Sequence, residues 1–309
     1  MRLLPRILAA AALCFTAACA SAQPLHAEKL SAHAYLVQGE SALGSRENRN
    51  FISNAGILIG PEGVVVFDAL GSPALARELV KTIRQLSDKP ITTVIVSHYH
   101  ADHIYGLQVF KDLGATIVAH SLGREYLYSE TASQRLKASI EAGLIEPGTR
   151  LVPADRWIDK QTQLRAGGLE LVLTPVGPAH TPEDLAVWLP SDQLILAGDI
   201  VFRGRVPYVG QADSARWIAS LDRLLAWPVK IVVPGHGPAS SDARVDMLLT
   251  RDYLAYLRAT MGRAARDMVP FEEAYAATDW SAYEGLPLFK VANRMNAYNT
   301  YLLMETQEK

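Results

Sequence analysis

Side chains that bind metal ions are concentrated in one short segment, residues 97–103. Three histidines and one aspartate fall within six positions of it: His98, His100, Asp102 and His103. Imidazole nitrogens together with a carboxylate suit the borderline-soft Zn²⁺ ion. Because neighbouring side chains in a turn can point to different ions, we expect His98 and His100 to share one metal and Asp102 and His103 another.

Three further candidate ligands each follow an apolar run of the kind that forms strands. They are His180 after residues 169–174, Asp199 after residues 193–197, and His236 after residues 231–233. Taken singly, each is more often an ordinary core or surface side chain. The whole set in this order uses five of the eight histidines and favours a metal site.

The ligand segment must be positioned by the elements around it. It follows a β-branched strand at residues 91–97 and precedes a helix expected at residues 104–113, so it lies at the carboxyl end of a strand. Further strands are expected at residues 55–59, 64–67, 116–119 and 185–189, and helices at residues 73–86 and 214–225. Strands and helices that alternate over this length predict one α/β layered domain.

Two regions depart from that alternation. From residue 244 to the C-terminus the pattern is mostly helical, with loops near Pro270 and Pro287. Residues 126–150 have the least regular pattern, and a helical insertion over the site is one interpretation. No internal repeat or linker divides the chain, so we expect a single domain over residues 23–309.

The first 22 residues have the pattern of a secretory signal peptide. Two arginines lie in a short basic start, an uncharged run rich in Ala and Leu spans residues 7–18, and small residues follow at 18–22. Both cysteines, Cys14 and Cys19, lie in this leader. Cleavage after Ala22 would leave no thiolate in the mature chain. We therefore expect a periplasmic or secreted protein; lipid attachment at Cys19 is an alternative with weaker support.

Composition excludes other classes of partner. The formal net charge is -2, from 30 basic and 32 acidic residues, and no block of like charge occurs. A nucleic-acid-binding protein would need a clustered basic surface, so none is expected as a partner. The apolar leader run is too short to span a membrane, which takes about 20 residues. A small molecule is the expected partner; the oligomeric state stays open.

The order of ligands resembles a known family. His-x-His-x-Asp-His followed by a lone His, a lone Asp and a lone His is similar to the metallo-β-lactamase superfamily, over about residues 39–239. Asp68, at the end of the strand at 64–67, resembles the family's first motif. The resemblance implies a four-layer αββα sandwich with a dinuclear site at the edge between two sheets; here a helical C-terminal segment follows.

The resemblance also implies a role for each residue. His98, His100 and His180 would bind a first zinc ion, and Asp102, His103 and His236 a second. Asp199 would bridge the two, and Asp68 would hold the ligand loop from behind.

Departures from the patterns of individual branches indicate which branch of the superfamily the chain resembles. Many true β-lactamases carry Cys or Ser where Asp199 stands, and a bridging Asp is more similar to glyoxalase II and lactonases. Residues 177–184 depart from the Gly-His-Thr-Pro-Gly pattern of glyoxalase II. The sequence resembles most the exported zinc hydrolases linked to sulfur-oxidation and quinoprotein gene clusters, a resemblance that defines no substrate.

The expected function is that of an exported hydrolase with two zinc ions per chain. A metal-activated hydroxide would cleave a small ester, thioester, lactone or amide, and Asp102 and Asp199 are the expected catalytic residues that orient it. β-Lactam hydrolysis is an alternative reaction. A non-hydrolytic metal-binding or redox relay protein on the same fold is an alternative of a different class, since His and Asp also bind iron.

An arginine pair suggests a substrate charge. Arg203 and Arg205 follow Asp199 on the loop that leaves the site, and an arginine fork suits a carboxylate, sulfate or phosphate. The alternative is that both face solvent or pair with acids such as Asp213. Asn54 and Tyr208 are further candidates for the pocket, whereas Tyr99 and His120 are expected to pack beside it.

Overall fold

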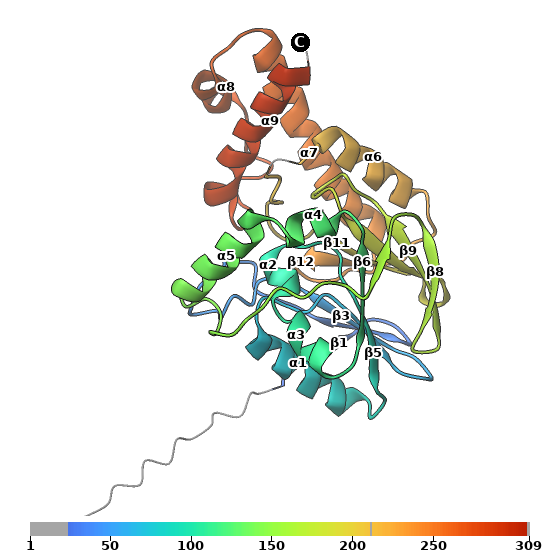
Figure 1. Cartoon of the computed structure of the whole chain (residues 1–309). Coiled ribbons are helices and arrows are strands. Elements are labelled where there is room, and N and C mark those ends of the chain that lie inside the picture. Colours follow the sequence, from blue (N-terminus) through green and yellow to red (C-terminus); the bar gives the residue numbers. More distant parts are fainter. Residues whose placement is uncertain (1–23, 211, 308–309) are drawn as a thin grey trace, which may run out of the picture.

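A computed structural model describes residues 24–210 and 212–307, and the leader at residues 1–22 lies outside them (Figure 1). One seven-stranded sheet has the order β1-β2-β3-β4-β5-β6-β7. Its strands are β1 (Glu28–Lys29), β2 (Ala34–Val37), β3 (Ala55–Ile59), β4 (Val64–Phe67), β5 (Ile91–Ile95), β6 (Thr116–His120) and β7 (Arg156–Ile158). The first four pair antiparallel, and β4 to β7 pair parallel.

The second sheet has five strands in the order β12-β11-β10-β9-β8. They are β8 (Thr162–Ala166), β9 (Leu169–Pro175), β10 (Leu185–Leu189), β11 (Leu194–Phe202) and β12 (Ile231–His236). The strand β12 pairs parallel with β11, and the other pairs are antiparallel. A short 3₁₀ turn, η1 (Pro190–Asp192), joins β10 to β11.

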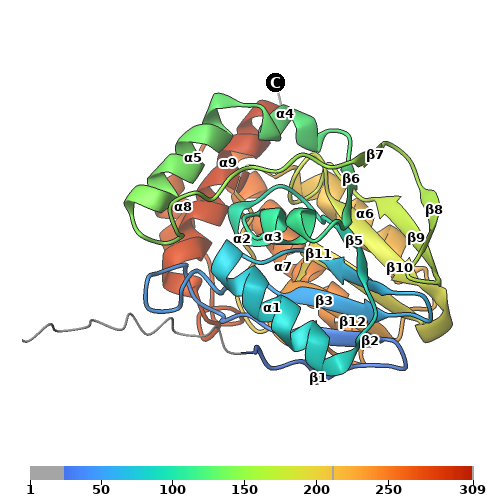
Figure 2. The ribbon, with the colours of Figure 1, turned by 60° about the horizontal axis from the view of Figure 1, so that its bottom comes forward.

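The two sheets pack face to face through one apolar layer. Leu58 and Val65 from the first sheet meet Leu173 and Leu196 from the second, all of them buried. Helices α1 (Pro73–Leu86), α2 (Ala101–Ile104) and α3 (Leu107–Asp112) lie on the side of the first sheet, and α6 (Ser214–Leu225) and α7 (Ala243–Arg266) lie on the other side (Figure 2). These layers confirm the expected αββα sandwich.

Helix ends follow the chemistry of their capping residues. The hydroxyl of Ser72 accepts a hydrogen bond from the Leu75 backbone N–H at 3.2 Å, and Pro73 occupies the first position of α1, as expected from the sequence. The carboxylate of Asp213 accepts from the backbone N–H groups of Ala215 and Arg216, both at 3.1 Å. Asp213 is therefore the N-cap of α6.

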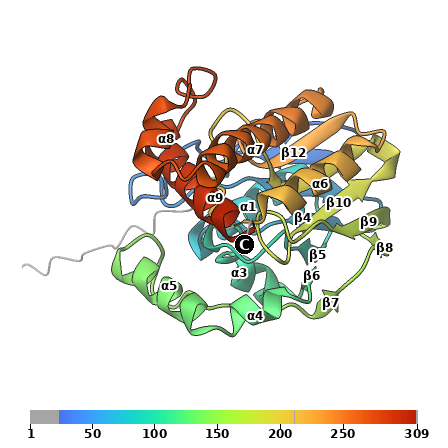
Figure 3. The same cartoon turned by 90° about the horizontal axis from the view of Figure 1, so that it is seen from above.

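Helices cover the carboxyl ends of the central strands. Between β6 and β7 lie α4 (Gly123–Leu127) and α5 (Glu130–Glu141), so the helical insertion is confirmed. The C-terminal segment continues from α7 through α8 (Phe271–Ala277) and a π-helical turn, η2 (Phe289–Asn293), to α9 (Arg294–Gln307). Seen from above, α4 and α5 lie along one edge, and α9 lies opposite them, nearer the middle of the molecule (Figure 3).

Several boundaries differ from those expected. The strands β1, β2, β7 and β8 were not predicted, and β11 and β12 extend through Asp199 and His236. Asp199 and His236 are both buried. Each strand therefore continues beyond the apolar run that predicted it and includes its buried polar ligand. The helix expected at residues 104–113 is two short helices, because the chain turns at Gly106, where a Cβ atom would lie 1.9 Å from the Ala69 carbonyl oxygen.

Candidate metal centre

The predicted ligands converge at one edge of the sandwich. Four come from the turn after β5, one from the loop between β9 and β10, and two from β11 and β12: His98, His100, Asp102, His103, His180, Asp199 and His236. They form two groups, within each of which the donor atoms lie within 4.8 Å of one another. We call His98, His100, His180 and Asp199 the first half-site, and Asp102, His103 and His236 the second half-site.

Asp199 lies between the two half-sites. Its Oδ2 is 3.4 Å from His180 Nε2 in the first half-site and 3.3 Å from His236 Nε2 in the second. Its Oδ1 is 3.3 Å from His103 Nε2. One carboxylate therefore faces donors of both groups, as a bridging ligand must.

The remaining distances are equally short. In the first half-site, His100 Nδ1 and His180 Nε2 are 3.0 Å apart, and His98 Nε2 is 3.9 Å from Asp199 Oδ2. In the second, Asp102 Oδ2 is 3.5 Å from His103 Nε2 and 3.4 Å from His236 Nε2. Donors from four separate elements or loops thus point at two small volumes.

Three atoms at the centre of this cluster are buried without a hydrogen-bond partner: His98 Nε2, His103 Nε2 and Asp199 Oδ1. An unpaired buried polar atom is costly, and native proteins rarely leave one unexplained. Metal coordination satisfies all three at once. The donor set of imidazoles and carboxylates therefore fits a pair of divalent metal ions.

Burial sets the protonation of the first half-site. It lowers the pKa of His98 well below its usual value, with the neighbouring His103 and His100 adding to the effect. It also lowers the pKa of His100 to about 3 and that of His180 in the same direction. Neutral imidazole is the form that binds metal, so these ligands need no deprotonation at neutral pH.

Carboxylates dominate the second half-site. Burial alone would lower the pKa of His103, but the charges of Asp102, Asp199 and Asp68 raise it well above its ordinary value. Burial would raise the pKa of Asp199, but His236 and His103 hold it well below the usual range. This half-site therefore keeps its acids ionised and attracts a cation.

Asp68 holds the ligand loop from behind. Its Oδ1 accepts a hydrogen bond from the Ser97 backbone N–H at 2.7 Å, and its Oδ2 accepts from the Ser97 hydroxyl at 2.8 Å. The same Oδ2 lies 2.8 Å from His103 Nδ1. Ser97 Oγ in turn lies 2.9 Å from His98 Nδ1. These contacts engage Nδ1 of His98 and of His103, and they leave Nε2 of each ring directed at the metal volume.

Backbone carbonyls orient two other ligands. His180 Nδ1 lies 3.0 Å from the Tyr208 carbonyl oxygen, and His236 Nδ1 lies 2.6 Å from the Ile52 carbonyl oxygen. Both contacts fix the N–H on Nδ1, which leaves Nε2 free to bind metal. Asn54 fastens the His236 loop, since its amide donates to the carbonyl oxygens of Pro234 and Gly237 at 2.8 and 2.7 Å.

Close backbone approach allows β12 to lie beside Asp199. A Cβ atom on Gly235 would lie 1.9 Å from Asp199 Oδ1, so only glycine fits there. Gly198 has a φ of 55° and faces Ser97, with 2.7 Å between its would-be Cβ and the Ser97 Cβ. These glycines let β11 and β12 bring their ligands against the turn after β5.

The arginine pair is split by the structure. Arg203 is not brought to the site: its Nε lies 2.9 Å from Asp246 Oδ1, and its Nη1 donates to the Ala239 carbonyl oxygen at 3.0 Å. Arg205 is only 7% exposed, and its Nη1 lies 3.3 Å from His236 Nδ1. No acidic side chain of the described residues forms an ion pair with Arg205. The predicted fork is not formed, and only Arg205 adjoins the metal centre.

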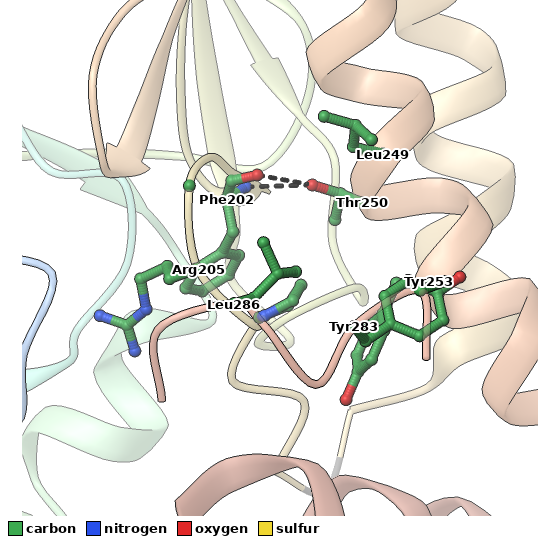
Figure 4. Close-up of a pocket in the computed structure, with 10 residues that line it drawn as sticks. Phe202, Arg205, Leu249, Thr250, Tyr253, Tyr283 and Leu286 are labelled. Carbon is green, nitrogen blue, oxygen red and sulfur yellow. Dashed lines mark hydrogen bonds between the residues drawn. The ribbon is translucent and has the colours of Figure 1, made fainter. Parts of the chain in front are cut away.

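Figure 4 shows how Arg205 is placed. Its stem lines a small apolar cavity of about 120 Å³ with Phe202, Tyr253 and Leu286, and its guanidinium points away from that cavity. The Phe202 ring, 5.6 Å from the guanidinium carbon, stacks on His236 with ring centroids 5.3 Å apart. Burial lowers the pKa of Arg205, and Asp199 and Asp102 oppose that shift, so its charge acts on the second half-site.

The other singled-out residues take supporting positions. Tyr99 is buried and stacks on Trp157 at 6.0 Å, away from the metal volumes. His120 Nδ1 accepts from the Leu122 backbone N–H at 3.4 Å, in line with the expected capping role. The side chain of Tyr208 lines a cavity beside His100 and His180. Sequence reasoning missed Ser97 as an orienting residue, although it immediately precedes the first ligand.

An αββα sandwich whose edge gathers these donors defines a metal-dependent hydrolase. Residues 48–236 match the model of the metallo-beta-lactamase superfamily, and the chain belongs to that superfamily. It is 30% identical over 190 residues to the metallo-beta-lactamase type 2 of Bacillus cereus, a match that covers 60% of this chain and 67% of that protein.

A second relative is an alkylsulfatase. The chain is 26% identical over 235 residues to the linear primary-alkylsulfatase of Pseudomonas sp. (strain ATCC 19151). This match covers 64% of the chain and 44% of the relative, so the chain spans less than half of that protein's length.

Solved structures confirm the fold. A double mutant of a sec-alkyl sulfatase aligns with a TM-score of 0.70 at 19% identity, over 90% of this chain and 50% of that one. A metallo-beta-lactamase from Pontibacter korlensis aligns with a TM-score of 0.59 at 21% identity, over 75% of this chain and 99% of that one. At these identities the likeness shows the fold alone.

Proposed function

We propose that this protein is a dinuclear zinc hydrolase. The observation that carries the proposal is the position of Asp199, whose two oxygens lie 3.3 to 3.4 Å from donors of both half-sites. His98, His100, His180 and Asp199 would hold one ion, and Asp102, His103, His236 and the shared Asp199 the other. When bound, the zinc pair would lower the pKa of water and so supply hydroxide near neutral pH.

The protein's own side chains would orient the reaction. Asp102 and Asp199 accept hydrogen bonds from the attacking water and hold it toward the cavity beside His100 and His180. Asp199 stays ionised, because His236 and His103 hold its pKa well below the usual range although burial opposes them. Arg205, buried next to His236, would bind an anionic group close to the scissile bond through charge-assisted hydrogen bonds.

We propose an ester with an anionic group as the substrate, with an alkyl sulfate ester as the first compound to test. The alkylsulfatase relative and the buried cation Arg205 support this choice. Thioesters, lactones and amides remain within the same proposal, since the metal-activated hydroxide would attack their carbonyl carbons, whereas it would attack a sulfate ester at sulfur or at the alkyl carbon. A β-lactam is the second candidate, supported by the 30% identity to a β-lactamase.

A hydrolysis screen on zinc-loaded protein tests the proposal. It should include sulfate esters, thioesters, lactones, phosphodiesters and β-lactams, with the metal-free protein as the control. We expect turnover of an anionic ester that is lost on chelation and restored by zinc. Full activity after chelation, or no activity on any of these bonds, would reject the proposed reaction.

Elemental analysis tests the alternative class. About two zinc ions per chain are expected in protein made with sufficient zinc. Iron in place of zinc, together with reversible one-electron oxidation, would instead support a redox relay protein on the same fold.

We also propose that the protein is exported and that the mature chain begins near Gln23. The support is the basic start, apolar run and small residues of the first 22 positions. In the part of the chain that the structure describes, no helix is long and apolar enough to cross a membrane. Intact mass of protein recovered from the periplasm of a Gram-negative host should lack residues 1–22; a mass that retains them contradicts export.

A further inference from the structure

The metal centre opens into a cavity of about 530 Å³ that is lined in part by residues of α5 and α9. Its floor is formed by His100 and His180 of the first half-site. The remaining lining residues come from α5, α9 and two loops: Arg135, Thr181, Pro182, Tyr208, Val209, Gly210, Met295 and Asn299. None of the lining residues is acidic, and Arg135 is the one that carries a permanent charge.

Arg135 has no acidic partner. Among residues 24–210 and 212–307, no carboxylate lies within ion-pair distance of its guanidinium, whose carbon lies 5.8 Å from the centroid of the Tyr126 ring. Lys137 of the same helix does have an acidic partner, since its Nζ lies 3.8 Å from Glu141 Oε1, whereas Arg124, like Arg135, lies over a ring, 4.9 Å from that of Trp157. An unpaired, exposed guanidinium keeps its donors available for an anion.

The opposite wall carries no charged side chain among its lining residues. Met295, on α9, exposes 37% of its surface, and the Asn299 amide is held by the Gly210 carbonyl oxygen at 2.7 Å. A molecule that enters the cavity therefore has an uncharged surface on one side and a single cation on the other. The cation lies on the helix insertion, apart from Arg205, which is buried beside the second half-site.

We propose that Arg135 is a specificity-determining residue that binds a second anionic group of the substrate, carried at the end away from the scissile bond. This inference rests on the proposed hydrolysis, in which Arg205 and the metal centre hold the reacting end. It names the substrate class as esters with an uncharged middle and a distal carboxylate, sulfate or sulfonate. Guanidinium suits such groups because it offers paired donors in one plane.

The kinetic test compares two esters that differ only in the distal group, a carboxylate in one and its amide in the other. Arg135→Gln should lower kcat/KM for the distal carboxylate by about tenfold, mainly through KM, and leave the amide unchanged. Arg135→Lys should recover part of the loss. Lys137→Gln removes one charge from the same helix and should change neither substrate. Equal losses on both esters, or an equal loss in Lys137→Gln, would overturn the proposal.

A binding test separates this inference from the proposed reaction. Calorimetry on zinc-loaded protein would compare an alkyl disulfonate with the monosulfonate of the same chain, neither of which is hydrolysed. The unmodified protein should bind the disulfonate more tightly, and Arg135→Gln should abolish the preference while Lys137→Gln keeps it. A preference that persists in Arg135→Gln, or is absent from the unmodified protein, refutes the role of Arg135. Absence of turnover with an intact preference refutes only the proposed reaction.

Discussion

Asp68 and His103 are joined by a contact of 2.8 Å between Asp68 Oδ2 and His103 Nδ1, at the base of the second half-site. Asp68 has a φ of 63°, in the left-handed region that Asp and Asn tolerate better than most residues. Its side chain also accepts from the Ser97 backbone N–H and hydroxyl. One buried carboxylate thus fixes the loop and one of its ligands together.

Asp68→Asn should weaken metal binding about 10- to 100-fold, the usual loss when a partner of a metal-ligating His is removed. Asn keeps the backbone conformation and the shape of the side chain, so the change isolates the charge and the direction of the hydrogen bonds. Competition with a chromophoric chelator would give the zinc affinity. An affinity equal to that of the unmodified protein would show that Asp68 only shapes the loop.

Asp199→Ala should loosen both metal ions, because its carboxylate faces both half-sites, whereas Asp102→Ala should affect mainly the second half-site. Elemental analysis after dialysis against a weak chelator measures the occupancy of each variant. Turnover should fall by orders of magnitude in Asp102→Ala and in His100→Ala, with the circular dichroism spectrum unchanged. The dinuclear centre would be contradicted if the unmodified protein held only one tight metal ion and Asp199→Ala did not change its occupancy.

Gly235→Ala should disrupt the metal centre although it replaces none of the ligands. The added Cβ atom would lie 1.9 Å from Asp199 Oδ1, a distance that forces the carboxylate or β12 to shift. We expect less than one zinc per chain and a large loss of turnover. The matched control is Gly285→Ala, since an added Cβ there meets no atom within 4 Å. The steric argument fails if Gly235→Ala binds metal normally.

Arg205→Ala should lower kcat/KM about ten- to a hundredfold on an anionic ester, because one charge-assisted contact is worth about 1.5–3 kcal/mol. The neutral analogue of the same ester should lose far less. Arg203→Ala serves as the comparison: its guanidinium pairs with Asp246, so this change should lower thermal stability rather than discriminate between substrates. Equal losses on both esters would mean that Arg205 only supports the loop.

The contact between the start of the first sheet and η1 should make stability depend on acid pH. Hydrogen bonds from Ser31, Ser191 and His33 lower the pKa of Asp192 to about 2, although partial burial opposes them. A lowered folded-state pKa stabilises the fold above the ordinary carboxyl pKa of about 4, and this contribution is lost as the pH falls through about 2. For a partly exposed group we expect roughly 1 kcal/mol.

Urea unfolding of Asp192→Asn and of the unmodified protein measures this contribution. Both should be chelated at every pH, so that metal release does not enter the comparison. The difference in the free energy of unfolding should be largest near neutral pH and shrink steadily between about pH 4 and pH 2. A difference that does not change over this interval would show that the hydrogen bonds act without the charge.

Local sequence patterns predicted much of the fold and of the candidate site. The helices at Pro73–Leu86 and Ser214–Leu225 were predicted at their observed bounds, since capping residues and apolar spacing lie within one short window. The ligand turn at residues 97–103 was equally visible, because three imidazoles and a carboxylate stand close together. Each of the three distant ligands follows its own strand, and the resemblance to the metallo-β-lactamase superfamily implied which metal each would bind.

What the sequence by itself determined, then, is which residues could bind metal and which strand precedes each of them. Tertiary structure decided where the arginines act: Arg203 turns to Asp246, 43 positions away, while Arg135 from the insertion reaches the cavity of His100 and His180. The β1–β2 hairpin and the polar extension of β11 also went unpredicted. Spacing along the chain reports local conformation, whereas the direction of a long side chain depends on partners that only folding brings beside it.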